Sequence, residues 1–204
     1  MNTPLVHQAA SLLLTYPGLD WPARHRSVRA ALRPESGGPA VRLLRFCARV
    51  QDVPTLALAA RYVATFDRSP RRTLYLTYHT DGDTRRRGAA LARLKGRYRA
   101  DGWQPAPDEL PDHLPLMLEF AARVPAAGRG LLHEHRAALE LLRLALEDHR
   151  SPYADVLDAV CRTLPGARPA DRAAARRLAR SGPPPLETVG LNSFPGSGPR
   201  GARR

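Results

Sequence analysis

Apolar residues recur every three or four positions along most of the chain, which is the spacing of one face of an α-helix. Proline, glycine and short polar runs interrupt this spacing at Pro17-Gly18, at residues 33–39 and at Pro165-Gly166. Helices with one apolar face each must bury that face against one another. The sequence therefore predicts an all-α fold, a single helical-bundle domain of about eight helices.

Two of the predicted helices carry assignments that depend on their bounds and register. The helix that begins near Asp52 is expected to bury one apolar face, made of Val53, Leu56, Ala60 and Val63. The longest helix is expected to run from about Arg129 to His149. On its solvent side, residues of opposite charge lie one turn apart, in the pairs Glu140–Arg143 and Arg143–Glu147.

One short segment, Thr73 to Tyr78, alternates in the manner of a β-strand and is rich in β-branched and aromatic residues. No second segment of this kind is visible in the sequence. A lone strand leaves its backbone hydrogen-bonding groups without partners. The segment is therefore interpreted as helical.

The charge of the chain is strongly positive, with a formal net charge of +13 at pH 7. Such a balance is typical of proteins that bind nucleic acid or an anionic surface. All but one of the 32 basic residues are arginine, and Lys95 is the exception, which indicates a compositional bias rather than a binding patch. The two cysteines, Cys47 and Cys161, fall on apolar helical faces and are expected to be buried thiols in a reducing compartment.

The sequence changes character after Gly166. Residues 167–204 carry eight arginines against Asp171 and Glu187, together with many prolines and glycines. Such a segment buries too little apolar surface to offset the entropy of ordering it. We expect a helical domain over residues 1–166, then a frayed helix near residues 170–180 within a flexible tail over residues 167–204. No apolar run approaches membrane-spanning length, so a cytoplasmic protein without membrane insertion is expected.

Polar side chains are most concentrated between Leu74 and Gly88. Histidines and carboxylates that could ligate a metal or act as acid and base are His79, Asp81, Asp83, Asp112 and His113. They match no known metal or catalytic spacing, and Asp81-Gly82-Asp83 is explained as a turn in which Asp83 or Thr84 caps the next helix. Asp112 is interpreted as a residue in the first turn of a helix from Glu109 to Val124. We expect no catalytic residue and no bound metal.

Three consecutive arginines, Arg85, Arg86 and Arg87, begin the helix after this turn. Cations in the first turn oppose the helix dipole. Their placement predicts that Asp81, Asp83 or another carboxylate pairs with them and fixes the loop.

Three long runs of the sequence resemble one protein family. RYVATFDRSPRRTLYLTYHTDGDTRRRGAALARLKGRYRADG (61–102), ELPDHLPLMLEFAA (109–122) and SPYADVLDAVCRTLP (151–165) are similar to the NarJ-type nitrate reductase assembly chaperones. These chaperones belong to the wider group of redox-enzyme maturation chaperones that includes the TorD and DmsD proteins. The resemblance implies an all-α fold and a cytoplasmic binding protein that is not an enzyme and holds no cofactor of its own.

The same resemblance implies a partner and a site. The partner is the apo catalytic (alpha) subunit of respiratory nitrate reductase, recognised through its N-terminal peptide and kept competent for insertion of the molybdenum cofactor and iron–sulfur centre before membrane docking. Molybdenum cofactor biosynthesis proteins are further implied partners. The E-x-x-D-H element of the wider family is present at residues 109–113. The client-peptide site is therefore expected at Glu109, Pro111, Asp112, His113, Tyr75 and Tyr78, beside a family-motif loop made of His79, Asp81, Asp83, Arg85, Arg86 and Arg87.

The alternative function is that of an arginine-rich helical nucleic-acid-binding protein, in which the arginines contact phosphates. The chain contains no recognisable helix-turn-helix, zinc finger or RNA-binding motif, so nucleic acid is not the expected partner.

Overall fold

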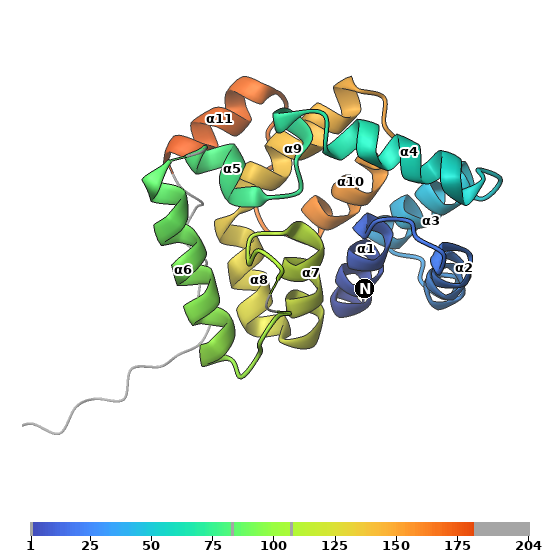
Figure 1. Ribbon diagram of the computed structural model, residues 1–204, viewed down its shortest axis with the longest axis horizontal. Coiled ribbons are helices and arrows are strands. Elements are labelled where there is room, and N and C mark those ends of the chain that lie inside the picture. Colours follow the sequence, from blue (N-terminus) through green and yellow to red (C-terminus); the bar gives the residue numbers. More distant parts are fainter. Residues whose placement is uncertain (1, 83, 107, 182–204) are drawn as a thin grey trace, which may run out of the picture.

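The computed structural model describes residues 2–82, 84–106 and 108–181. Within these ranges the chain is helical, and Figure 1 shows the helices in one body, which confirms the predicted all-α fold. The predicted disordered end falls largely on residues 182–204, which lie outside the described residues. The elements are α1 (Thr3–Leu14), α2 (Trp21–Leu32), α3 (Gly38–Val50), α4 (Thr55–Phe66), η1 (Pro70–Arg72, a 3-10 helix), α5 (Leu76–Asp81), α6 (Arg85–Ala100), α7 (Leu114–Arg123), α8 (Pro125–Glu134), α9 (Arg136–Asp148), α10 (Ala154–Arg162) and α11 (Arg172–Ser181).

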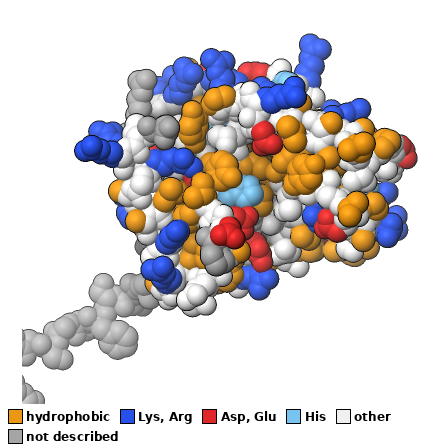
Figure 2. Space-filling view, in the orientation of Figure 1, with side chains coloured by type: hydrophobic (Ala, Val, Ile, Leu, Met, Phe, Trp, Pro, Cys, Tyr) orange, Lys and Arg blue, Asp and Glu red, His pale blue; other side chains and the backbone are white. Residues whose placement is uncertain are grey.

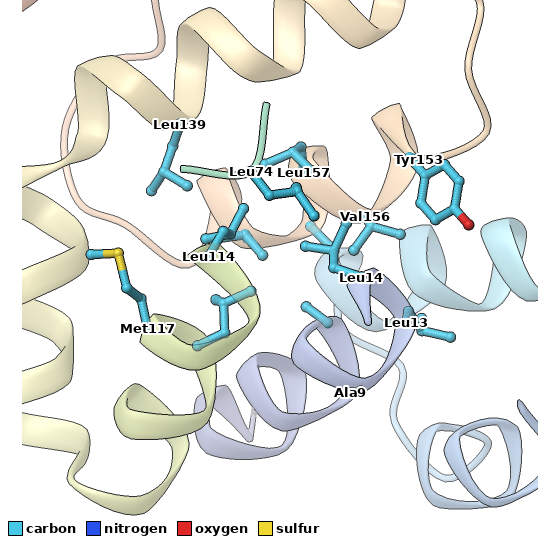
Figure 3. Close-up of a cluster of buried hydrophobic side chains, with 14 of the residues drawn as sticks. Ala9, Leu13, Leu14, Leu74, Leu114, Met117, Leu139, Tyr153, Val156 and Leu157 are labelled. Atoms are coloured by element: carbon cyan, nitrogen blue, oxygen red, sulfur yellow. The ribbon is translucent and has the colours of Figure 1, made fainter. Parts of the chain in front are cut away.

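Helix α1 lies at the centre of the packing, against α7, α10 and α2, although it begins the chain. Its Leu13 and Leu14 are fully buried, and Figure 3 shows Leu14 beside Val156 and Leu157 of α10. On the other side of this core, Leu114 and Met117 of α7 and Leu139 of α9 complete a continuous apolar cluster. The core therefore joins the first helix to elements more than a hundred residues away.

The predicted long helix from Arg129 to His149 is wrong in its bounds, because the chain breaks into α8 and α9 at His135. His135 leaves helical geometry (φ −94°, ψ 13°), and its Nδ1 lies 3.0 Å from the carbonyl oxygen of Leu131. The break lets α8 pack against α7 while α9 packs against α10 and α11. This break adds one helix to those that the sequence predicted.

The apolar face assigned to the fourth helix is wrong at Leu56 and Ala60, which are exposed, although Val53 does pack against the core. Leu56 is 83% exposed, whereas Leu58, Tyr62 and Phe66 are buried. The helix begins at Thr55 rather than near Asp52, and its aromatic residues determine which face turns inward. The Tyr62 ring contacts the rings of Phe66 and Tyr153, and its hydroxyl donates to the carbonyl oxygen of Leu14 at 2.9 Å. Two large aromatic side chains bury more apolar area than Leu56 and Ala60.

A buried ionic network lies beneath the end of the described chain. Glu140 is fully buried, and its Oε2 lies 2.6 Å from Nε of Arg143, which itself lies 2.6 Å from Glu147 through Nη1. The two predicted pairs exist, but Glu140 and Arg143 face the protein interior rather than solvent. Arg136, 1% exposed, donates to the carbonyl oxygens of Gly166 and Ala167 at 3.0 and 3.1 Å.

The segment after Gly166 packs against this network within the described residues. Arg168 pairs with Asp158 at 2.5 Å, Ala175 is fully buried, and α11 lies against α9, as Figure 1 shows. The predicted helix near residues 170–180 is present as α11. The division into domains at residue 166 stays a prediction, but residues 167–181 do not behave as a free tail.

A buried histidine makes the stability of this core dependent on pH. His7 is 1% exposed, its Nε2 lies 2.8 Å from Thr163 Oγ1, and burial lowers its pKa from 6.5 to about 4. Above pH 6.5 the ring is neutral in both states, whereas below it the unfolded chain binds the proton first. The free energy of unfolding should therefore fall by about 1 kcal/mol over the first pH unit below 6.5.

Urea unfolding of the wild type and of His7→Gln between pH 7 and pH 5 measures this effect. Glutamine can still donate to Thr163 but does not titrate, so the stability of the variant should decline less steeply. Parallel curves for the two proteins would contradict the assignment to His7.

Candidate functional site

The structure brings together the two stretches that the sequence analysis singled out, residues 74–88 and residues 109–113. Tyr75 and His113 form an isolated antiparallel β-bridge. The Leu76 amide donates to the carbonyl oxygen of Asp112 at 3.0 Å, and the Leu114 amide donates to that of Leu74 at 2.9 Å. The strand-like pattern of residues 73–75 thus has a partner that the sequence did not reveal, while the predicted helix begins at Leu76.

Asp112 is fully buried and ties three segments together. Its Oδ2 accepts from Thr77 Oγ1 at 2.5 Å and lies 3.5 Å from Nη2 of Arg87, whose Nε donates to Thr77 Oγ1 at 3.2 Å. The prediction that a carboxylate pairs with the arginine triplet is therefore confirmed for Arg87, whereas Arg85 and Arg86 are exposed. Placing Asp112 in the first turn of a helix was wrong, because α7 begins at Leu114 and Asp112 precedes it.

His113 and Glu109 lie at the surface edge of this anchor. His113 Nδ1 lies 3.0 Å from Glu109 Oε1, and the His113 ring packs on the ring of Tyr75 with centroids 5.2 Å apart. The guanidinium of Arg87 lies 5.9 Å from the centre of the Tyr75 ring. Pro111 fixes the segment from below, since its carbonyl oxygen accepts from the buried hydroxyl of Tyr98 at 2.7 Å. The element 109–113 is thereby held at its middle by Tyr98 and at its end by the bridge to Tyr75.

A groove opens beside this cluster, with a volume of about 460 Å³. We call it the aromatic groove; its lining residues are Phe66, Asp67, Ser69, Pro70, Thr73, Tyr75, Tyr78, Arg87 and Leu110. Two of its apolar side chains are exposed, Tyr75 at 37% and Leu110 at 39%. Figure 2 shows hydrophobic side chains gathered around a histidine near the start of α7, with acidic side chains next to it. A surface of this composition suits an apolar segment that carries basic or polar groups at its edge.

Most of the remaining predicted residues form contacts within the fold. His79 Nε2 lies 2.9 Å from the carbonyl oxygen of Thr73, and burial lowers the pKa of His79, so the ring is neutral near pH 7. Asp81 accepts from Thr80 at 3.1 Å through its carboxylate, and Asp83 lies outside the described residues. Thr84 occupies the N-cap position of α6, but its hydroxyl donates to the Asp81 carbonyl rather than capping an amide.

Several residues of the site were missed in the sequence, among them Thr77, Phe66 and Leu110. Thr77 and Phe66 lie on helical faces that read as ordinary core, and Leu110 lies between the polar residues of the E-x-x-D-H element. Leu110 could have been identified from the sequence, because an apolar side chain in a short polar loop has no neighbouring helical turn to cover it. Thr77 gave no signal, because its role depends on a carboxylate 35 residues away.

No set of three or more His, Cys, Asp or Glu side chains within the described ranges lies close enough to hold a metal ion. The same part of the chain contains no helix both long and apolar enough to cross a membrane.

Comparisons with known proteins show what this chain resembles. The family described as nitrate reductase delta subunit matches residues 29–159. The Bacillus subtilis protein named as a probable nitrate reductase molybdenum cofactor assembly chaperone, NarJ, is 37% identical over 163 residues, which cover 77% of this chain and 88% of that protein. The nitrate reductase molybdenum cofactor assembly chaperone NarJ of Escherichia coli K12 is 36% identical over 119 residues, which cover 57% of this chain and 50% of that protein.

A longer relative and a solved structure extend the comparison. The nitrate reductase-like protein NarX of Mycobacterium tuberculosis is 44% identical over 161 residues, which cover 78% of this chain; the chain therefore spans about a quarter (24%) of that protein. The crystal structure of a protein described as a redox enzyme maturation protein, from Archaeoglobus fulgidus, matches with a TM-score of 0.59. That match has 24% identity and covers 80% of this chain and 93% of the other, so it supports the fold.

Proposed function

Because the chain belongs to the nitrate reductase delta subunit family, we propose that it is an assembly chaperone for the catalytic subunit of a nitrate reductase. The names of its NarJ relatives support this role. We propose that it acts in the cytoplasm, without turnover, and holds the cofactor-free subunit competent for insertion of the molybdenum cofactor and iron–sulfur centre before membrane docking. Proteins of molybdenum cofactor biosynthesis are proposed as further partners.

The observation that carries this proposal is the aromatic groove beside residues 109–113. We propose that the N-terminal segment of the client lays an apolar face against Tyr75 and Leu110. Tyrosine supplies a large contact area at low conformational cost. Glu109, which is 42% exposed through its side chain, is available to receive a basic group of that segment.

Asp112 has a different role in this proposal from the one the sequence suggested. It is fully buried under Thr77 and Arg87, so it positions the groove rather than contacting the client. Pro111 acts in the same way through its carbonyl oxygen. Tests of direct contact should therefore alter exposed residues, because substitutions of Asp112 would disturb the fold as well.

Tyr75→Ala and Leu110→Ala are each expected to weaken binding of the client's N-terminal peptide by about tenfold, because each removes an exposed apolar contact. Isothermal titration calorimetry with a synthetic peptide from the catalytic subunit of the same organism measures the affinity. Leu56→Ala is the matched control, since Leu56 is 83% exposed and lies ten residues from the groove residue Phe66 on α4. Equal affinities for all four proteins would exclude the aromatic groove as the peptide site.

One observation favours the alternative, a nucleic-acid-binding protein. Helix α6 exposes Arg85, Arg86, Arg93, Lys95 and Arg99, and its sequence contains no carboxylate. Binding to phosphates through these residues would weaken steeply with salt, whereas binding in an apolar groove would not. A titration of the same protein with single-stranded RNA and with the client peptide at two salt concentrations separates the two functions.

A further inference from the structure

A second hollow, distinct from the aromatic groove, is lined by arginines from five parts of the chain. Its volume is about 600 Å³, and it shares no lining residue with the aromatic groove. Arg42, Arg45 and Arg49 come from α3, and the other four arginines come from α9, α10, the turn between them, and the segment before α11. We call this hollow the arginine pocket.

The floor of the arginine pocket is made of buried carboxylates that hold the guanidinium groups in place. Asp155, with a side chain 5% exposed, lies 3.1 Å from Arg45 and 3.2 Å from Arg49. Asp158, 11% exposed, lies 3.0 Å from Arg42 and 2.8 Å from Arg162. Burial alone would raise the pKa of Asp158, but hydrogen bonds from Arg162 and Arg168 outweigh it and hold that pKa below its usual value.

The pocket keeps an excess of positive charge after these pairs are formed. Seven arginines line it, against the lining carboxylates Glu147, Asp155 and Asp158 and the buried Glu140 that Arg143 and Arg168 contact. The excess is three positive charges. Each guanidinium has five N–H donors, and Arg42 meets Asp158 through Nε while Arg49 meets Asp155 through Nη1. Donors therefore remain for a ligand, on groups whose positions are already fixed.

The backbone is strained at Arg150, one of the arginines that line the pocket. Arg150 has φ 52°, and no other non-glycine residue in the described part of the chain has a positive φ. Its amide donates to the carbonyl oxygen of Glu147 at 2.9 Å, and the Ser151 amide donates to that of Leu146 at 2.9 Å. Helices commonly end in this geometry with glycine, which adopts positive φ without steric cost. Arginine at this position costs free energy but adds a cation to the pocket.

We propose that the arginine pocket binds a small phosphorylated anion of the size and charge of a diphosphate group. Guanidinium groups bind phosphate oxygens in bidentate geometry, and a diphosphate carries about three negative charges near pH 7, which matches the excess. A single hollow lined from five segments suits a compact anion better than an extended acidic peptide, whose charges are spread along a chain. The ligand is either free diphosphate or the diphosphate portion of a larger molecule.

Calorimetry of the full-length protein with sodium diphosphate, at constant ionic strength, tests this proposal. The wild type should bind one diphosphate per chain, and Arg150→Gly should weaken binding about tenfold. The melting temperature of Arg150→Gly should be unchanged or higher, since glycine relieves the strained backbone. If Arg150 had only a structural role, Arg150→Gly would not weaken binding while leaving the melting temperature unchanged or higher. Arg93→Gln, an exposed arginine of α6 outside the pocket, is the charge-matched control.

Each outcome bears on the proposal. Saturable binding that is weakened by Arg150→Gly and kept by Arg93→Gln supports it, and tighter binding of a nucleoside diphosphate than of free diphosphate would identify a larger ligand. Equal weakening by both substitutions, absence of saturation, or tighter binding of hexaglutamate than of diphosphate would overturn it.

Discussion

Replacing Glu140 by glutamine is expected to lower the free energy of unfolding by about 3–5 kcal/mol, because it leaves buried cations without their counter-charge. Glu140 is fully buried, and Arg143, Arg168 and Arg136 lie 2.6, 3.6 and 3.9 Å from its oxygens. Glutamine has nearly the same volume, so packing is kept while the charge is lost. The segment that joins Arg168 to α11 should loosen first.

Urea denaturation of Glu140→Gln and of a matched control measures this effect. Glu119→Gln is the control, because Glu119 pairs with Arg123 at 2.8 Å on the surface of α7, and such pairs contribute about 0–1 kcal/mol. Similar losses for the two variants would show that the buried network contributes no more than a surface pair.

Gly128→Ala is expected to lower the free energy of unfolding by about 3 kcal/mol, because α7 and α8 approach each other too closely for an added methyl group. A Cβ at position 128 would overlap the backbone of Ala121, which has no room to move within the core. The contact therefore outweighs the gain in helix propensity of roughly 0.5–1 kcal/mol that alanine brings over glycine.

Gly96→Ala is the matched control for this substitution. A Cβ at position 96 of α6 would meet no atom within 4 Å, so this variant should gain about 0.5–1 kcal/mol. Thermal unfolding of the two variants should thus shift in opposite directions. A shift of the same sign in both would contradict the close approach of α7 and α8.

Helical periodicity was sufficient to predict the fold class and the existence of most helices, since each apolar stripe needs a partner face. It failed where side chains compete for the interior. Leu56 fits the helical spacing, yet the rings of Tyr62 and Phe66 take the buried side of α4. It also failed at His135, where the chain leaves helical geometry without a proline or glycine to mark the break.

One contact within the candidate site could be predicted from the sequence, but the assembly of the site could not. The sequence indicated that a carboxylate pairs with the arginine triplet, and the structure shows Asp112 on Arg87. It could not show that Tyr75 and His113 meet, because a single bridge between segments 38 residues apart leaves no periodic pattern. The burial of Asp112 was equally hidden, and it changes which residues are available to a client.

We propose that the chain recognises the cofactor-free catalytic subunit of a nitrate reductase through the aromatic groove. The most direct measurement is the affinity of the purified full-length protein for that subunit, prepared without and with its cofactors. A binding assay with the full-length protein immobilised on a sensor surface gives both affinities. We expect tight binding of the cofactor-free subunit, at least tenfold weaker binding of the finished subunit, and loss of the difference in the combined Tyr75→Ala and Leu110→Ala variant. Equal affinity for the two forms of the subunit, or binding to neither, would contradict it.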